Sequence, residues 1–202
     1  MGKLDAGTVM QGSVLIAEDE WITAAVLSRQ VRSHGYEVIG PVGTGTATLD
    51  SCRRQLPDVV LMDIQMPEMD GLTATRALMT SCPVPVIVVT GNASLKRQAA
   101  EAGAMDYLMK PVLPRHLPEV IARARERFGR YQQVREGAAS DEDALAIWVV
   151  VQAAVGMLVE QAAVSEPVAF ERLRGRASTS ERTLRAEAQA VFDAADEGGP
   201  AG

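Results

Sequence analysis

The stretch "VVLMDIQMPEMDGL", residues 59–72, gives the clearest indication of the fold. Its apolar residues follow one another without alternation, which is typical of a strand buried on both faces. The run ends at Asp63, and Met66-Pro67 and Asp70-Gly71 then form turn sequences. For a single aspartate at a strand end, a capping or turn role is the most common explanation. The surrounding sequence decides whether Asp63 has another role.

Short apolar runs recur along the first part of the chain, with helix-length segments between them. They are "SVLIA" (13–17), "EVIG" (37–40), "DVVLM" (58–62), "VPVIVV" (84–89) and "MDYLM" (105–109). Strands that alternate with helices favour parallel βα units, whose right-handed crossovers place helices on both faces of the sheet. We therefore predict a five-stranded, doubly wound parallel α/β sheet over about the first 125 residues.

Polar residues follow four of the predicted strands. In open parallel sheets, ligands bind beyond the carboxyl ends of the strands, so these residues should meet in one pocket. Clustered carboxylates repel one another unless a proton or a cation neutralises them, and Mg²⁺ is commonly held by one or two carboxylates. The residues are "EDE" (18–20), Asp63, "TGN" (90–92) and "MKP" (109–111).

Four of these motifs, "LIAEDE", "LMDIQMPEMDG", "VVTGN" and "YLMKP", closely resemble the receiver domains of two-component response regulators over about residues 13–128. The resemblance implies that Asp63 accepts a phosphoryl group from a sensor histidine kinase. It also implies Mg²⁺ as the cofactor, held by Asp19, Asp63 and the backbone carbonyl of Gln65, with Glu18 in the outer shell or bound through water. Many relatives have two aspartates where this chain has Glu18-Asp19, and the charge is preserved.

The same resemblance assigns roles to three further residues. Lys110 would pair with the phosphoryl group, and its bond to Pro111 would be cis. Thr90 would bind a phosphoryl oxygen and, together with Tyr107, would form the switch pair. A structural role in the core is the alternative for Tyr107. Apart from its own phosphorylation and dephosphorylation, the chain is not expected to be an enzyme, because it has no nucleotide-binding loop.

Beyond the predicted sheet, the pattern favours three helices at about 141–163, 166–177 and 180–196. Ser165 and Ser180 stand where caps of the second and third helices are expected. Residues 153–191 resemble the ANTAR domain, a three-helix RNA-binding module of transcription antiterminators. The matching positions are Ala154, Gly156, Leu158, Ser165, Ala169, Phe170, Leu173, Ala177 and Leu184. The predicted organisation is a disordered tail (1–12), a receiver domain (13–128), a helical linker (129–140) and an ANTAR-like domain (141–197).

The charge balance argues against RNA binding. Lys and Arg equal Asp and Glu in residues 1–140, at 15 each, whereas residues 141–202 hold 5 against 11 and so carry the whole net charge of −6. RNA affinity depends on neutralised phosphates, and Val155 stands where ANTAR domains usually have a basic residue. A local basic face and an ordinary solvated surface are both open for the arginines, which are Arg172, Arg174, Arg176, Arg182 and Arg185.

A second hypothesis is therefore an ANTAR-like domain that binds protein, with phosphorylation controlling assembly. Trp148 and the apolar residues after it would contribute an interface, and the arginine-rich segment 115–135 would form salt bridges across a homodimer. No membrane span is predicted, because the longest apolar stretch, 147–159, is shorter than the roughly 20 residues required. Cys52 and Cys82 lack metal-ligand spacing and are expected to be reduced, which favours the cytoplasm.

Overall fold

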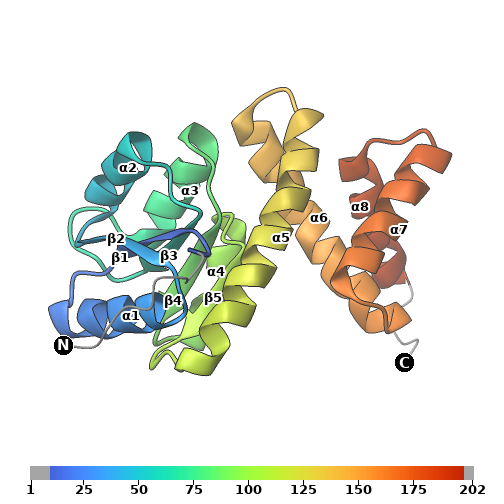
Figure 1. Ribbon diagram of the computed structural model, residues 1–202. Coiled ribbons are helices and arrows are strands. Elements are labelled where there is room, and N and C mark those ends of the chain that lie inside the picture. Colours follow the sequence, from blue (N-terminus) through green and yellow to red (C-terminus); the bar gives the residue numbers. More distant parts are fainter. Residues whose placement is uncertain (1–9, 198–202) are drawn as a thin grey trace. The chain divides into compact units, whose positions relative to one another are not determined.

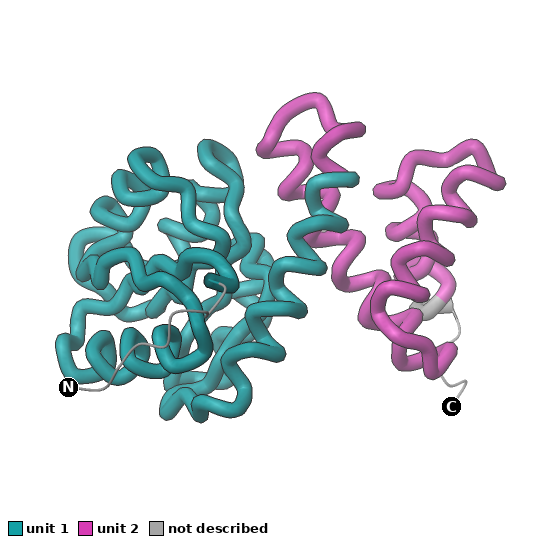
Figure 2. The backbone as a smooth tube through the Cα atoms, in the orientation of Figure 1, with its two compact units in different colours: residues 1–133 teal, residues 134–202 magenta. Residues whose placement is uncertain are grey.

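The computed structural model describes residues 10–197, and the chain divides into two compact units between residues 133 and 134 (Figure 2). The first, here called the α/β unit, contains a sheet with helices on its faces (Figure 1). The second, here called the helical unit, contains helices without strands among its described residues.

The described residues of the α/β unit form one five-stranded sheet in the order β2-β1-β3-β4-β5, with every neighbouring pair parallel. This confirms the predicted fold class. The strands are β1 (Ser13–Ala17), β2 (Glu37–Val42), β3 (Val59–Asp63), β4 (Val86–Thr90) and β5 (Asp106–Met109).

The third strand begins one residue later than predicted and includes Asp63 as its last residue. Asp58 lies outside the strand because its carboxylate accepts hydrogen bonds from the backbone and hydroxyl of Ser13, at 2.7 and 3.1 Å. It thus has the turn role that aspartate commonly has, whereas Asp63, on a fully buried strand, does not.

Helices connect successive strands: α1 (Trp21–Ser33), α2 (Gly45–Arg54), α3 (Gly71–Ser81) and the short α4 (Lys96–Glu101). The long α5 (Leu117–Glu136) follows the last strand. Side chains on one face of the sheet form a single core with α2, α3 and α4, and the members include Leu15, Val60, Val88, Leu49, Leu78 and Ala99. Alternate strand residues point to the opposite face, and Val14, Ile16, Leu61 and Ile87 are buried there. Burial on both faces explains the continuous apolar runs.

Helix α5 begins at Leu117, after a 3-10 turn at Pro114–His116. Its inner face is apolar, with Leu117, Ile121 and Ala124 fully buried. The buried hydroxyl of Tyr131 donates to the backbone oxygen of Met79 in α3, at 3.2 Å, so the second half of α5 is also attached to the α/β unit.

The helical unit packs three helices pairwise: α6 (Asp141–Ala162), α7 (Glu166–Thr179) and α8 (Leu184–Glu197). The hydroxyl of Ser140 caps α6 by accepting from the backbone N–H of Asp143. The prediction that Ser180 caps the third helix is wrong, because Ser180 ends α7 and its N–H and hydroxyl both donate to the Arg176 oxygen. Thr183 is the residue whose hydroxyl accepts from Ala186 at the start of α8.

Trp148 does not form an exposed interface. Its side chain is 1% exposed and lies in the core of the helical unit, together with Ala154, Val155, Phe170 and Leu173. The prediction for Trp148 was wrong because the sequence of α6 has few polar residues to distinguish its inner face from its outer face.

By length and composition, α6 is also the one described helix that could cross a membrane, with a mean hydropathy of 1.7. Core helices of soluble proteins pass the same test, and α6 packs against both α7 and α8. The predicted absence of a membrane span stays a prediction.

Most of the predicted N-terminal tail, residues 1–9, lies outside the described residues. The backbone N–H of Gln11 donates to the backbone oxygen of Gly35, and that of Glu37 donates to the oxygen of Gly12. Residues 11 and 12 of the predicted tail are therefore attached to the α/β unit.

Candidate functional site

An acidic cluster lies at the carboxyl ends of β1 and β3. One oxygen each from Glu18, Asp19 and Asp63 lies within 4.8 Å of the others. Glu18 and Asp63 are buried, at 4% and 6% exposure, whereas Asp19 is exposed. The predicted convergence of strand ends on one acidic pocket is therefore present, with two of the carboxylates removed from water.

Lys110, directly after β5, supplies the positive charge of this cluster. Its Nζ atom lies 2.8 Å from Glu18 Oε2 and 3.0 Å from Asp63 Oδ2, so one ammonium group contacts two carboxylates from different strands. The parallel pairing of β4 with β5 places it, because the Lys110 N–H donates to the Thr90 oxygen. The Lys110–Pro111 bond is cis, as the resemblance implied.

Burial raises the pKa of Glu18, and the charge of Asp63 adds to this effect, although the hydrogen bond from Lys110 opposes it. Burial alone would lower the pKa of Lys110, but its hydrogen bonds to Glu18 and Asp63 outweigh burial, so the pKa of Lys110 is raised. The ammonium form of Lys110 is therefore favoured, and the site retains one fixed cation among three acids.

The loop after Asp63 is held close to the strand by Gly71. A Cβ atom at this position would lie 1.9 Å from the Asp63 backbone oxygen, so only glycine fits here. Asp70 caps α3 by accepting from the N–H groups of Leu72 and Thr73, both at 2.9 Å. Gln65 lies between the strand and this cap and is exposed. The Met-Pro and Asp-Gly sequences thus turn the chain sharply after Asp63.

The predicted switch residues lie on neighbouring strands. Thr90 is 4% exposed and its hydroxyl accepts from the Asn92 N–H at 3.1 Å. Tyr107 is half-buried and packs against the core on the α4 side of the sheet. The ammonium group of Lys96 lies 4.6 Å from the centre of its ring, a cation–π contact that sequence reasoning missed. Sequence reasoning missed this contact because Lys96 and Tyr107 are eleven residues apart, on α4 and β5, and an irregular connection joins these two elements.

The donor set fits a hard divalent cation. One oxygen from each of three carboxylates, those of Glu18, Asp19 and Asp63, gathers at the carboxyl ends of β1 and β3, against the single ammonium group of Lys110. Oxygen ligands with an open, water-accessible side suit Mg²⁺.

The five arginines after residue 140 are all exposed. Three of them have acidic neighbours: Arg174 pairs with Glu171 at 2.9 Å, Arg182 with Glu187 at 3.7 Å, and Arg185 with Asp143 at 4.0 Å. Among the described residues, no carboxylate lies within ion-pairing distance of Arg172 or Arg176. These two are one turn apart on α7, so they share a face.

Comparison with known proteins agrees with this geometry. Residues 14–122 match the family described as the response regulator receiver domain, which is more than half of the chain. The chain belongs to the response regulator receiver family. Residues 141–191 of this response regulator match the ANTAR domain, which confirms the second predicted resemblance and covers α6, α7 and most of α8.

One similar protein spans both units. The transcriptional regulatory protein PdtaR of Mycobacterium tuberculosis (strain ATCC 25618 / H37Rv) is 31% identical over 191 residues, covering 94% of this chain and 93% of that protein. The DNA-binding response regulator MtrA of Mycobacterium leprae (strain TN) is 32% identical over 123 residues, covering 60% of this chain and 53% of that protein. The likeness to PdtaR therefore includes the helical unit, whereas the likeness to MtrA is shorter.

Solved structures resemble the α/β unit, which is the receiver domain of this chain. The receiver domain of the sensor histidine kinase PA1611 from Pseudomonas aeruginosa PAO1, which holds a magnesium ion in its active-site cleft, is 32% identical with a TM-score of 0.53. It covers 57% of this chain and 98% of its own. The signal receiver domain of a modulated diguanylate cyclase from Desulfovibrio desulfuricans G20 is 30% identical, with a TM-score of 0.54 over 57% of this chain and 94% of its own.

Proposed function

We propose that this response regulator is phosphorylated on Asp63 by a sensor histidine kinase in the cytoplasm. The observation that carries the proposal is the contact of Lys110 with both Glu18 and Asp63, beside the exposed Asp19. Asp63 ends a buried strand, and its carboxylate lies beside the exposed Asp19, on the side from which a phosphodonor would approach.

In the proposed reaction, an Asp63 carboxylate oxygen attacks the phosphorus of the phosphodonor. The bond between phosphorus and the donor breaks, and an acyl phosphate forms on Asp63. Lys110 moves from the carboxylates toward the phosphoryl oxygens and stabilises the charge on them. The hydroxyl of Thr90 binds a further phosphoryl oxygen, which is the step that would alter the environment of Tyr107.

Asp19, Asp63 and the Gln65 carbonyl would hold Mg²⁺, with Glu18 in the outer shell or bound through water. The ion would add electrostatic stabilisation of the transferring group. Because burial raises the pKa of Glu18, a second positive charge beside Lys110 would also help to keep this carboxylate ionised.

For the output, we propose RNA binding by the ANTAR domain with antitermination of transcription as the consequence. The exposed face of α7 supports this: Arg172 and Arg176 lie on it without acidic partners, beside the exposed Val168. Pro167, Val168, Glu171 and Arg172 line a shallow depression there of about 420 Å³. A cationic, partly apolar face suits single-stranded loops, which are bound by phosphate contacts and by stacking.

The test is binding to a labelled panel of two-hairpin RNAs at low and moderate salt, with and without beryllofluoride and magnesium. We expect salt-sensitive binding that depends on Asp63 and is weakened about uniformly across RNAs by Arg172→Gln with Arg176→Gln. Arg174→Gln is the matched control, because Arg174 already pairs with Glu171. Binding that is equal in Asp63→Asn and wild type would reject phosphorylation control of RNA contact.

The alternative function is a phosphorylation-controlled protein-interaction or homodimerisation module. The eleven acids against five arginines after residue 140 favour it. So do the partly exposed residues Val149 and Val150 on the uncharged middle of α6. No RNA binding in either state, together with a beryllofluoride-dependent increase in sedimentation coefficient, would establish this alternative. A monomer in both states would reject homodimerisation.

A further inference from the structure

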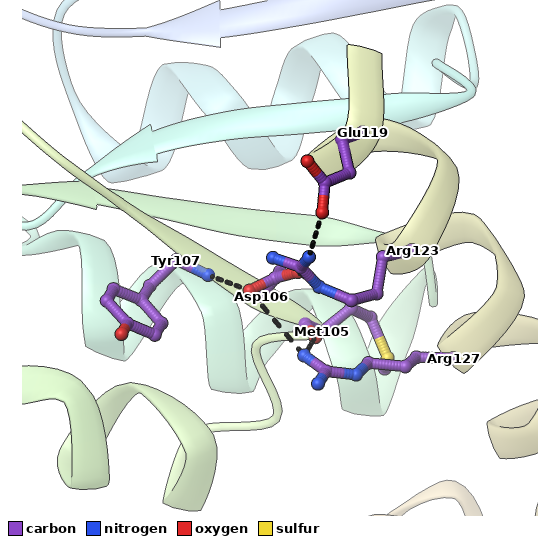
Figure 3. Close-up of polar contacts among 6 residues, drawn as sticks. All are labelled: Met105, Asp106, Tyr107, Glu119, Arg123 and Arg127. Carbon is purple, nitrogen blue, oxygen red and sulfur yellow. Dashed lines mark hydrogen bonds and ion pairs between the residues drawn. The ribbon is translucent and has the colours of Figure 1, made fainter. Parts of the chain in front are cut away.

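A second charged cluster lies away from the phosphorylation pocket, at the opposite end of β5. It joins the start of this strand to α5 (Figure 3). Asp106 is its centre, and its side chain is only 3% exposed. A buried carboxylate is costly unless ion pairs and hydrogen bonds compensate it, so its partners show what the position requires.

Two arginines of α5 are those partners. The Arg123 Nε atom donates to Asp106 Oδ2 at 2.5 Å, and Arg127 Nη1 lies 3.5 Å from Asp106 Oδ1. Arg127 Nη1 also donates to the backbone oxygen of Met105 at 2.7 Å. Arg123 and Arg127 are four residues apart and therefore project from the same face of the helix. Two successive turns of α5 thus hold the first residue of β5 and the residue before it.

The cluster reaches the switch residue directly. The backbone N–H of Tyr107 donates to Asp106 Oδ1 at 2.8 Å, and Figure 3 shows the Tyr107 ring on the other side of this bond from the arginines. The carboxylate that accepts from the Tyr107 backbone is therefore the one that pairs with Arg123 and Arg127. At the other end of β5, Lys110 directly follows Met109 and contacts Asp63.

The clamped helix is the covalent route to the helical unit. Helix α5 runs without a break from Leu117 to Glu136 and passes the division between the two units at residues 133 and 134. Its second half is attached to α3 by the Tyr131 hydroxyl. The first half of α5 is attached to β5, the strand that carries Tyr107, by the polar contacts of Arg123 and Arg127.

We propose that Asp106, Arg123 and Arg127 form a clamp that transmits the state of β5 and Tyr107 to α5, and through α5 to the ANTAR domain. The clamp residues are positioning residues, because none of them lies in the phosphorylation pocket. This inference rests on the proposed phosphorylation of Asp63. A purely structural ion cluster would stabilise the α/β unit equally with and without the phosphoryl group. A transmitting clamp would instead be required for α5 to change when the phosphoryl group binds.

The experiment is hydrogen–deuterium exchange of the full chain, followed by mass spectrometry, with and without beryllofluoride and magnesium. The test variant combines Asp106→Asn, Arg123→Met and Arg127→Met. It removes the ion pairs without leaving a buried unpaired charge and retains an oxygen to accept from the Tyr107 N–H. Tyr131→Phe is the matched control, because it removes the hydrogen bond between α5 and α3 and leaves the clamp intact. Arg127→Met alone is the milder variant if the triple variant does not fold.

In wild type and in Tyr131→Phe, we expect beryllofluoride to change exchange both around Asp63 and β5 and along residues 117–162. In the clamp variant, the change around Asp63 and β4 should persist. The change along 117–162 should fall to less than about one fifth of the wild-type value, since allosteric coupling is typically fivefold or more.

An equal change along 117–162 in wild type and in a folded clamp variant would overturn the clamp while leaving phosphorylation control intact. A wild type that changes around Asp63 but not along 117–162 would also overturn it. If beryllofluoride changes nothing around Asp63 in wild type, the proposed phosphorylation itself fails, and the clamp fails with it.

Discussion

At the scale of single residues, the charge of Lys110 holds the pocket together. Its ammonium group contacts two buried carboxylates, and the pKa of Glu18 is already raised by burial and by Asp63. Without Lys110, Glu18 and Asp63 would face each other with no fixed cation from the chain. The pocket would then lose both its electrostatic balance and the group that we propose to bind the phosphoryl oxygens.

We therefore predict that Lys110→Met slows phosphorylation of Asp63 by acetyl phosphate about 100-fold, the usual effect of losing one group that stabilises developing charge. Phosphate-affinity electrophoresis over time measures the rate. Lys96→Met also removes one lysine charge, outside the pocket, and should retain the wild-type rate within a few-fold. Equal rates for Lys110→Met and wild type would show that Lys110 has no part in the reaction.

Lys96 has a separate role at Tyr107. Its cation–π contact with the ring should favour the present ring position by about 0.5–1 kcal/mol, because Lys96 is exposed. Lys96→Met should free the ring and tighten beryllofluoride binding by up to about fivefold. Fluorotyrosine NMR of Tyr107 and a beryllofluoride titration would measure both effects. Lys96→Arg retains the cation and serves as control; an unchanged Tyr107 resonance in Lys96→Met contradicts the prediction.

At the scale of elements, the turn after β3 depends on the close approach of α3 to the strand. Gly71→Ala would place a methyl group 1.9 Å from the Asp63 oxygen, so the end of β3 must move. We predict a loss of about 3 kcal/mol or more in the free energy of unfolding, as for other backbone clashes. Gly129→Ala, inside α5 with nothing near its Cβ position, should instead gain up to about 1 kcal/mol. Urea denaturation of both variants measures the difference, and a Gly71→Ala protein as stable as wild type would contradict it.

Asp70, at the start of the same helix, should make stability depend on pH. Its hydrogen bonds to the N–H groups of Thr73 and Leu72 lower its pKa below the ordinary value near 4. A lowered folded-state pKa means that the stabilisation is complete above the unfolded pKa and is lost as pH falls through the folded pKa.

Asp70→Asn keeps an oxygen cap but cannot titrate, so its stability relative to wild type should improve only below about pH 4. Asp70→Ala should cost about 1 kcal/mol near neutral pH through loss of the cap. Thermal unfolding between pH 3 and pH 7 tests both variants. A constant difference between Asp70→Asn and wild type across this range would be inconsistent with the lowered pKa.

The strands and caps differ in how far the sequence alone predicts them. The five strands were predictable because burial on both faces produces continuous apolar runs, and the polar residues ending them identified the pocket. The Asp106 clamp was not predictable, because its partners lie 17 and 21 residues away on a helix whose arginines look alike in sequence. Ser180 was misplaced because a serine that follows a helix and precedes another can serve either end.

At the scale of the whole molecule, two clusters of charged side chains lie at the two ends of β5. Lys110 follows β5 in the proposed phosphorylation pocket, and Asp106 begins β5 in the proposed clamp. Helix α5 then continues from the receiver unit into the helical unit. This path gives the proposed phosphorylation of Asp63 a continuous physical route to the ANTAR domain, without any requirement for direct contact between Asp63 and the output helices.

The measurement that tests the central claim most directly is the stoichiometry and position of phosphorylation. The intact chain is incubated with acetyl phosphate and Mg²⁺, or with a phosphorylated sensor kinase, and analysed by intact-mass and peptide mass spectrometry. The account predicts one base-labile and hydroxylamine-labile phosphoryl group in the peptide that contains Asp63, abolished by Asp63→Asn and by removal of Mg²⁺. A phosphoryl group that persists in Asp63→Asn, or none in the wild-type chain under conditions that phosphorylate another receiver, would contradict it.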